Sequence, residues 1–411
     1  MRTKKYLQFG IRQRLYQGSG CISMIPEILE TEGWKRVMLI ADPALYNIGV
    51  IEPIENLLKE SEGVEYCVFT DIRPNPEAVT IDTKAVPMYQ EFRADVMIAV
   101  GGGSTMDTAK GVAIVGDSGK KCMDFVGIPQ HKPLAHHTYP MIAVPTTAGT
   151  GSDVCINAVI CDEKGFKLVP SHDCLLPAYS LMDPDLLAGL PFSVAAATSV
   201  DTLTHALESY TNMNANDFTE LFSLRSLELV GEAIRPFCAN PAVDEYANKM
   251  SLACMYAGFS LGIASIGQDH VITHPMSEEP FHMPHGDACG MALPAVIEWN
   301  AMGCKEKYRK AYNALTKKQV APEDFDVKML IDWVIELNRD LNIAQNKTFE
   351  EWGYNDKEVL ELMLKHPIFN NKDKTRNPDC NYPRVTRMKE FAHIIKRINY
   401  YSKVQAGKSE N

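Results

Sequence analysis

Short apolar runs alternate with longer amphipathic segments through the first half of the chain. The apolar runs, which predict buried strands, cover residues 37–41 (VMLIA), 66–69 (YCVF), 96–100 (VMIAV) and 141–144 (MIAV). Residues 51–62 and 77–92 lie between them and carry apolar side chains at helical spacing. Strands that alternate with helices are typical of a parallel sheet, so we expect an α/β domain over residues 1–190.

The pattern changes near residue 191, where the strand signals end and helical spacing dominates. Segments with this spacing cover residues 193–210, 219–233, 243–259, 291–300, 305–315, 358–364 and 388–399. We therefore expect an all-α domain over residues 191–411, with a ligand cleft between it and the first domain. The polar tail at 403–411 is expected to be disordered.

Length and charge narrow the class of protein. The chain has 411 residues, more than one ordinary core accommodates, which agrees with two domains. Its 41 Lys and Arg stand against 52 Asp and Glu, a formal net charge of −11, and its basic residues form only isolated pairs such as 4–5 and 120–121. This balance disfavours nucleic acids and anionic membranes as partners.

Cysteine usage and hydropathy indicate the compartment. The 11 cysteines are scattered, with no CxxC pair, which favours reduced thiols over a disulfide framework. The start of the chain has no apolar segment typical of a signal peptide, and no window approaches the roughly 18 unbroken apolar residues of a membrane helix. We expect a soluble cytoplasmic protein.

Histidines cluster between residues 270 and 285. His270 and His274 stand at i and i+4, so on a helix that breaks near Pro275 they share one face, and a loop can bring His285 back toward them. Asp201 and His205 have the same spacing upstream. Three imidazoles and one carboxylate suit Zn²⁺ or Fe²⁺. Such pairs also occur as ordinary surface hydrogen-bonded pairs, so spacing alone leaves both interpretations open.

The strand at 96–100 runs into Gly101, Gly102, Gly103 and Ser104, a glycine turn that opens a helix and is suited to bind phosphate. The turn lacks the Lys-Ser/Thr of a Walker A motif. It also departs from the Rossmann fingerprint, because the acidic candidate Asp42 precedes the glycines instead of following them. A second turn-rich loop at 145–152 is either a further phosphate or ribose contact or an ordinary connection.

Five segments stand in one order: GGGSTMDTAK (101–110), PTTAGTGSD (145–153), DPDLLAGLP (183–191), DTLTHALESY (201–210) and HxxxHP…PHG (270–286). Together they resemble the iron-dependent (group III, metal-containing) alcohol dehydrogenase family, whose fold is shared with glycerol dehydrogenase and dehydroquinate synthase. The resemblance covers nearly the whole chain. It implies a Rossmann-like α/β domain with a non-standard fingerprint, followed by an all-α domain.

The resemblance also implies roles for individual residues. The metal ligands fall on Asp201, His205, His270 and His285, which would hold one divalent Fe²⁺ or Zn²⁺, while His274 lines the active site and is the candidate for catalytic proton transfer. His282 is interpreted as a loop histidine. The residues implied in NAD binding are Asp42, Asn75, Gly101, Gly102, Gly103, Ser104, Asp107, Thr146, Thr147, Thr150 and Lys167. Asp42 would contact the adenosine ribose and repel a 2′-phosphate, which favours NAD over NADP.

The chain departs from the family near the expected substrate pocket. The segment from Ser277 to His282 is about one residue longer than usual. Polar or small residues replace an aromatic and apolar stretch, and two acids lie in the neighbouring loop: Gly262, Ile263, Gln268, Asp269, Glu278 and Glu279. If these residues line the pocket, they favour a short polar alcohol or aldehyde, because burying polar groups against an alkyl chain is unfavourable. Alternatively, they face solvent or a second subunit.

The expected activity is therefore NAD-dependent, metal-assisted hydride transfer between a small primary alcohol and its aldehyde, by a homodimer or larger homo-oligomer. A reductase of a small anionic aldehyde such as sulfoacetaldehyde is one alternative. A dehydroquinate synthase-type lyase on the same fold is another, and a non-catalytic nucleotide or metal sensor is a third.

Overall fold

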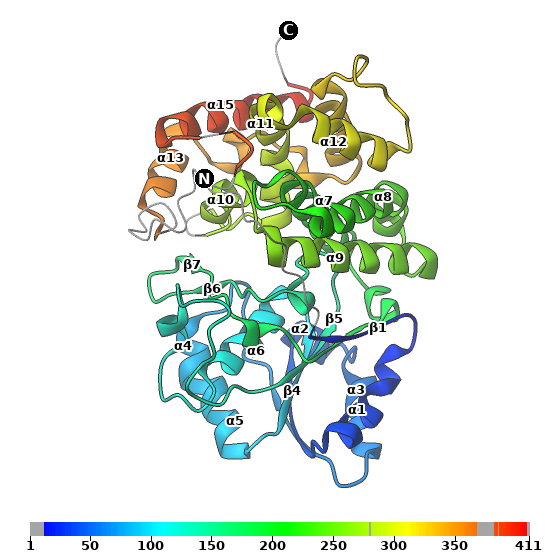
Figure 1. The fold of residues 1–411 in the computed structure, drawn as a ribbon, viewed down its shortest axis with the longest axis vertical. Coiled ribbons are helices and arrows are strands. Elements are labelled where there is room, and N and C mark those ends of the chain that lie inside the picture. Colours follow the sequence, from blue (N-terminus) through cyan, green and yellow to red (C-terminus); the bar gives the residue numbers. More distant parts are fainter. Residues whose placement is uncertain (1–11, 279–280, 368–381, 385, 409–411) are drawn as a thin grey trace.

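The computed structural model describes residues 12–278, 281–367, 382–384 and 386–408. A six-stranded parallel sheet with helices on both faces forms the first half, and helices form the second (Figure 1). This arrangement confirms the predicted fold class. The predicted boundary at residue 190 falls between the last strand of the sheet and the first helix of the second half, and it stays a prediction.

The sheet has the order β1-β8-β5-β4-β2-β3. Its strands are β1 (Arg14–Gln17), β2 (Arg36–Ala41), β3 (Glu65–Phe69), β4 (Val96–Gly101), β5 (Met141–Pro145) and β8 (Tyr179–Met182). β2 and β4 pair in register from Val37↔Val96 to Ala41↔Val100. The four predicted strands are confirmed. A separate antiparallel pair joins β6 (Ile160–Cys161) to β7 (Lys167–Leu168).

Successive residues of the central strands point to opposite faces of the sheet. Met38 and Met97 pack on the face covered by α5 (Val86–Phe92) and α6 (Gly103–Val115). Val37 packs on the other face, with other apolar side chains of the strands, against α1 (Ile25–Glu32) and α3 (Glu52–Glu60). Burial on both faces explains why these strands are continuous apolar runs.

The predicted helix at 77–92 is broken into three parts. It comprises α4 (Ala78–Thr80), a π-helical turn at Ile81–Ala85, and α5. Pro87 has no N–H to donate to the carbonyl of Thr83, which weakens regular α-helical bonding across this turn.

The second half contains α7 (Phe192–Thr211), α8 (Asp217–Ala239), α9 (Asp244–Ala264), α10 (Gln268–Met276), α11 (His285–Thr316), α12 (Val327–Asp340), α13 (Asp356–Lys365) and α15 (Met388–Gln405). They share one apolar core. The segments predicted at 291–300 and 305–315 belong to the single helix α11, in which only Cys304 has non-helical backbone angles (φ −148°, ψ 30°).

The start of the polar tail was wrongly predicted. Helix α15 continues to Gln405, whose Nε2 donates to the carbonyl of Ile343 at 2.8 Å, so these residues are ordered by packing. Residues 409–411 lie outside the described part.

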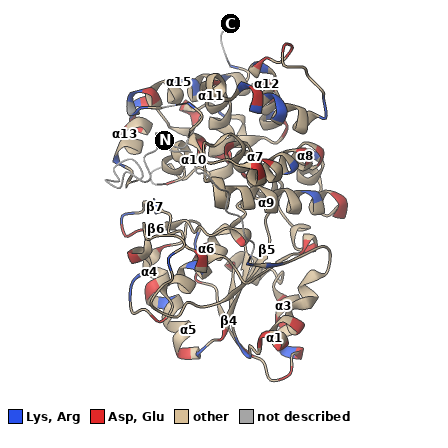
Figure 2. Ribbon diagram, in the orientation of Figure 1, with Lys and Arg blue, Asp and Glu red and all other residues tan. Residues whose placement is uncertain are grey.

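Charged residues occur on both halves of the molecule. Acidic and basic residues are interspersed over the outer helices of both halves (Figure 2). No individual helix within the described ranges is long and apolar enough to cross a membrane; α9 and α10 meet that criterion only together, across a 103° bend. The ten cysteines of the described residues are free thiols.

Candidate active site

The glycine turn lies at the carboxyl end of β4, where Gly102 caps α6. A Cβ on Gly101 would lie 2.2 Å from the Thr105 Oγ1, and one on Gly103 would lie 2.7 Å from the Thr150 Cγ2. Both positions therefore require glycine for packing within the protein. The second contact also holds the 145–152 loop directly against the glycine turn, so the two predicted cofactor loops form one surface.

Asp42 lies at the carboxyl end of the neighbouring strand β2. Its Oδ1 accepts from the backbone N–H groups of Ala44 (2.8 Å) and Leu45 (3.2 Å), which caps the short helix α2 (Pro43–Asn47). β3 lies on one side of β2, and the chain then crosses over to form β4 on the other side of β2. The strand order therefore changes direction between β2 and β4. Ligands of open α/β sheets bind at such a switch point, where Asp42 and the glycine turn stand side by side.

Asp107, one turn into α6, is buried and bound by protein donors. Its carboxylate accepts from Ser152 Oγ at 2.7 Å and from the Val159 N–H at 3.0 Å. Burial raises its pKa, against the opposing effect of Lys110 and these hydrogen bonds. The side chain thus ties α6 to the segment after the 145–152 loop, a structural role in addition to the implied cofactor contact.

Three further implied cofactor residues, Thr146, Asn75 and Lys167, come from different segments of the chain. Thr146 is buried, and its N–H donates to the Gly101 carbonyl at 3.0 Å. Asn75 has a left-handed backbone (φ 61°), and its Nδ2 donates to the Ser277 carbonyl of the helical half at 3.5 Å. Lys167, in β7, is buried, and burial lowers its pKa.

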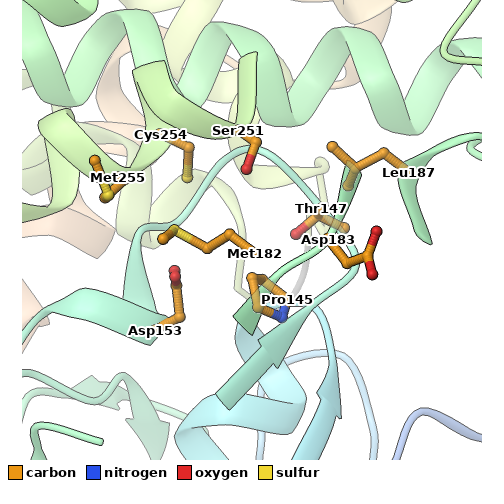
Figure 3. Close-up of a pocket in the computed structure, with 9 residues that line it drawn as sticks. All are labelled: Pro145, Thr147, Asp153, Met182, Asp183, Leu187, Ser251, Cys254 and Met255. Atoms are coloured by element: carbon orange, nitrogen blue, oxygen red, sulfur yellow. The ribbon is translucent and has the colours of Figure 1, made fainter. Parts of the chain in front are cut away.

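The pocket in Figure 3 lies between the carboxyl ends of β5 and β8 and helix α9. Thr147 and Asp183 approach each other there, and Ser251 and Cys254 lie above them on the helix (Figure 3). Its lining residues are Pro145, Thr147, Asp153, Met182, Asp183, Leu187, Ser251, Cys254 and Met255. The pocket contains one implied cofactor residue and none of the implied metal ligands.

Three of the four implied metal ligands converge from α7, α10 and α11. The His270 Nε2 lies 3.4 Å from the Asp201 Oδ1, and the His285 Nε2 lies 3.9 Å from the same oxygen. Asp201 Oδ1 and His270 Nε2 are buried, and neither has a hydrogen-bond partner among the described residues. Orphaned donor atoms that face one another deep in a protein fit a cation.

His205 stands at the edge of this group. Its Nδ1 is 3.7 Å from the Asp201 Oδ1 and 3.3 Å from the Gly149 carbonyl, and its ring stacks on His270 with centroids 4.4 Å apart. The four donor atoms that lie within 4.8 Å of one another, in the part of the chain that the structure describes, belong to Asp201, His270, His285 and Cys289. His205 as a ligand stays a prediction.

Glu208 contacts the His270 ring on the side opposite Asp201. Its carboxylate accepts from the His270 Nδ1 at 2.6 Å and from the N–H groups of Gly267 (2.9 Å) and Asp269 (2.6 Å). A carboxylate on Nδ1 fixes the imidazole tautomer that presents Nε2 to a metal. Glu208 is not among the predicted site residues, although it stands seven positions after Asp201 on the same helix face.

The carboxylates set the charges of the cluster. Burial opposes ionisation of Asp201, but attraction to His205 and contact with His270 bring its pKa below the ordinary value. Burial also disfavours a charged His270, yet Asp201 and Glu208 outweigh it and raise the pKa of His270 to about 10. Burial lowers the pKa of His285 well below its ordinary value, so this ring is neutral. A neutral imidazole and an ionised carboxylate are ready to bind a cation.

His274 lies next to the cluster, with its ring centroid 5.5 Å from that of His285. It is buried, and its Nδ1 has no hydrogen-bond partner within the described ranges. Burial lowers its pKa well below the ordinary value, and the charges of His285 and Lys167 add to this effect. The ring is therefore neutral and placed beside the metal ligands.

Two residues expected in the substrate wall point elsewhere. The Gln268 Nε2 donates to Thr386 Oγ1 in the helical core. Asp269 is fully buried beside Glu208, and burial together with that carboxylate raises its pKa well above the ordinary value. The sequence alone does not show which face of α10 carries Gln268 and Asp269, so it could not predict that both side chains point into the protein.

Of the other residues expected in the substrate wall, one is exposed, one lies outside the described residues, and one is buried near the site. Ile263 is 38% exposed, and Glu279 lies outside the described residues. Glu278 is buried, and its Oε1 accepts from the Lys167 N–H at 2.9 Å and lies 3.2 Å from the His366 Nε2. This carboxylate bridges β7 of the sheet half and the segment after α13 in the helical half.

The comparisons with known proteins agree with this geometry. The family model described as "Iron-containing alcohol dehydrogenase" matches residues 12–184, and "Fe-containing alcohol dehydrogenase family, C-terminal" matches residues 195–396. The choline dehydrogenase of Bacillus subtilis (strain 168) is 30% identical over 399 residues, covering 96% of this chain and 95% of its own. The lactaldehyde reductase of Escherichia coli (strain K12) is 28% identical, covering 81% and 86%.

A solved structure of 1,3-propanediol oxidoreductase superposes with a TM-score of 0.85 at 25% identity, covering 96% of this chain and 100% of that one. The two family models together span most of the chain, and the relatives align over both halves. The chain therefore belongs to the iron-containing alcohol dehydrogenase family and is an alcohol dehydrogenase or aldehyde reductase.

Proposed function

We propose that the chain interconverts a short, polar primary alcohol and its aldehyde, with NAD(H) as the cofactor and one divalent ion, Fe²⁺ or Zn²⁺, at the site. The observation that carries this proposal is the convergence of Asp201 Oδ1 and His270 Nε2, buried 3.4 Å apart and with no hydrogen-bond partner among the described residues, next to His285. When bound, the metal would act as a Lewis acid toward the substrate oxygen, and NAD(H) would carry the hydride.

The residues of the chain hold these groups in place. Asp201, His270 and His285 would bind the ion, with His205 as the fourth ligand that the family resemblance implies. Glu208 accepts the proton on the His270 Nδ1, so the proton that the ion would displace is the one on Nε2, the nitrogen that faces Asp201. The glycine turn with α6 would receive the pyrophosphate of NAD, and the carboxylate of Asp42 would accept from the adenosine ribose.

His274 is the proposed route for the alcohol proton. The ring is neutral, buried beside His285, and has an Nδ1 that no described residue satisfies. Such a ring can accept a proton at that nitrogen and pass it toward solvent. Packing beside the metal ligands is its alternative role. Replacement of His274 by Gln should change the pH profile of kcat in the first case and only the stability in the second.

The proposed substrate class is based on the charged side chains nearest the histidine cluster. The Lys167 charge acts on His274 and His285, and Glu278 and His366 lie buried next to its backbone. Buried polar groups of this kind disfavour a long alkyl chain and favour a substrate with a second polar group. The names of choline dehydrogenase, lactaldehyde reductase and 1,3-propanediol oxidoreductase point to small polar substrates for those proteins.

The test is steady NADH release from a panel of C2–C4 alcohols and diols by protein loaded with Fe²⁺ or Zn²⁺. His270→Ala should lose metal and turnover and keep NAD binding, whereas His131→Ala, at an exposed histidine paired with Asp173, should keep all three. Full metal content and activity in His270→Ala would contradict the proposal. Catalytic NADH release also excludes a dehydroquinate synthase-type lyase, which has no net redox change.

A further inference from the structure

The segment of the chain just before α15 packs against α11. A Cβ on Gly303 of α11 would lie 2.2 Å from the Pro383 carbonyl oxygen, so the backbone of the segment touches the helix. The guanidinium carbon of Arg384 lies 3.5 Å from the centre of the Trp299 ring, and the Arg384 Nη1 donates to the Trp299 carbonyl at 3.0 Å. These contacts fix the segment on the middle of α11.

Thr386, which follows in the same segment, contacts two helices through one hydroxyl. The side chain is fully buried. Its Oγ1 accepts from the Gln268 Nε2 of α10 and from the Trp299 Nε1 of α11 at 2.7 Å. It donates to the Arg384 carbonyl at 3.0 Å. The hydroxyl therefore uses its proton and both lone pairs, and it joins α10 to α11.

The same two helices carry two of the proposed metal ligands. Gln268 is the first residue of α10 and stands two positions before His270. His285 is the first residue of α11, and its ring centroid lies 5.2 Å from that of His270. Glu208 holds the start of α10 through two backbone N–H groups, and the Gln268 side chain holds it through Thr386. The two sets of hydrogen bonds together fix the direction from which His270 enters the cluster.

We propose that Thr386 is a positioning residue for the metal site, because its hydroxyl holds the first turn of α10 against α11 and so keeps the His270 imidazole aligned with the other ligands. This inference rests on the proposed metal-dependent function. Thr386 acts through Gln268 and Trp299. Without the hydroxyl, two buried N–H groups lose their acceptor, and α10 must move to regain one.

The test compares Thr386→Val with Thr386→Ser in the Co²⁺-loaded protein. Valine has nearly the shape of threonine but cannot accept a hydrogen bond, whereas serine keeps the hydroxyl. Thr386→Val should bind Co²⁺ about 3–30-fold more weakly, a size found for residues that influence a ligand site without touching it. It should also shift the visible ligand-field bands, which report the coordination geometry of the ion. Thr386→Ser should restore the wild-type affinity and bands.

Thr219→Val is the matched control. Thr219 is also fully buried, and its Oγ1 accepts from the Asn216 N–H at 2.9 Å at the start of α8, a helix that carries none of the proposed ligands. This variant should lose stability and keep the Co²⁺ affinity and bands. Wild-type bands in Thr386→Val overturn the inference, whether or not stability falls, because a purely structural role lowers stability alone.

Gln268→Met replaces Thr386→Val if that variant does not fold. It removes only the hydrogen bond to α10 and leaves Thr386 bound to Trp299, and it should shift the same bands. Unchanged bands in Gln268→Met would overturn the inference and leave the proposed function standing. A wild-type protein that binds no Co²⁺ would reject the proposed function and this inference together.

Discussion

Replacing Glu208 by Gln would remove one negative charge and one hydrogen-bond acceptor next to the proposed metal site. The wild-type carboxylate accepts from three N–H groups: the His270 Nδ1 (2.6 Å) and the backbone of Gly267 (2.9 Å) and Asp269 (2.6 Å). The Glu208 Oε2 accepts from His270 and Gly267, and its Oε1 accepts from Asp269. A glutamine has nearly the same shape, yet only one of its two terminal atoms can accept, so at least one of these N–H groups loses its acceptor. The substitution also removes the negative charge that makes the His270 imidazole more basic.

The expected loss of metal affinity follows from the removal of that carboxylate. Removing a partner that orients a metal-binding histidine typically weakens metal affinity 10–100-fold, or about 1.4–2.8 kcal/mol. The buried NH₂ group that replaces an accepting oxygen should also lower the free energy of unfolding of the metal-free protein by about 1–3 kcal/mol. Metal affinity is measured by competition with a chelator, and stability by denaturant unfolding of the metal-free protein.

Glu298→Gln is the control, because Glu298 pairs with Arg397 (2.6 and 2.8 Å) further along α11. It should reduce stability modestly and leave metal affinity unchanged. Metal affinity in Glu208→Gln within about twofold of wild type would refute the role given to the Glu208 carboxylate, since that change is below the expected 10–100-fold range.

Three further predictions concern cofactor, pH and substrate. Asp42→Gly should shift discrimination toward NADP by about 1–3 kcal/mol through loss of charge repulsion, and a wild-type preference for NADPH would contradict it. The pKa of His270 is raised to about 10, so a metal must displace its proton; metal affinity should therefore rise with pH, about tenfold per unit below that value, and a flat profile between pH 6.5 and 8.5 would rule this out. The buried Lys167, Glu278 and His366 should make short polar alcohols better substrates than hexanol by kcat/KM, and equal turnover of hexanol would reject the polar site.

The sequence predicted those parts of the fold in which one local pattern decides the structure. The strands 37–41 and 96–100 are buried on both faces, so their apolar runs identify them directly. β1 was missed because Arg14–Gln17 (RLYQ) is a partly exposed edge strand that carries polar residues. The separate helices 291–300 and 305–315 merged because only one residue, Cys304, interrupts α11.

At the site, the i, i+4 spacing predicted which residues share one helix face. The structure brings Asp201 and His270, one from each predicted pair, within 3.4 Å, and their role as metal ligands stays a prediction. Glu208 lies on the same helix as Asp201, but a single glutamate in a largely apolar helix gives no separate signal. The orientation of Gln268 depends on Thr386, which is 118 residues away, so only the folded chain reveals it.

The convergence of α7, α10 and α11 has a practical consequence for the purified protein. Asp201, His270 and His285 are brought together only when the helical half has folded, so an ion held by all three binds the native state and not the unfolded chain. Free metal at 100 times its dissociation constant would then raise the free energy of unfolding by about 2.7 kcal/mol. Melting temperature would report metal loading, and batches from metal-poor cultures would melt in two transitions. A thermal-shift screen with different divalent ions would rank them before any substrate is known.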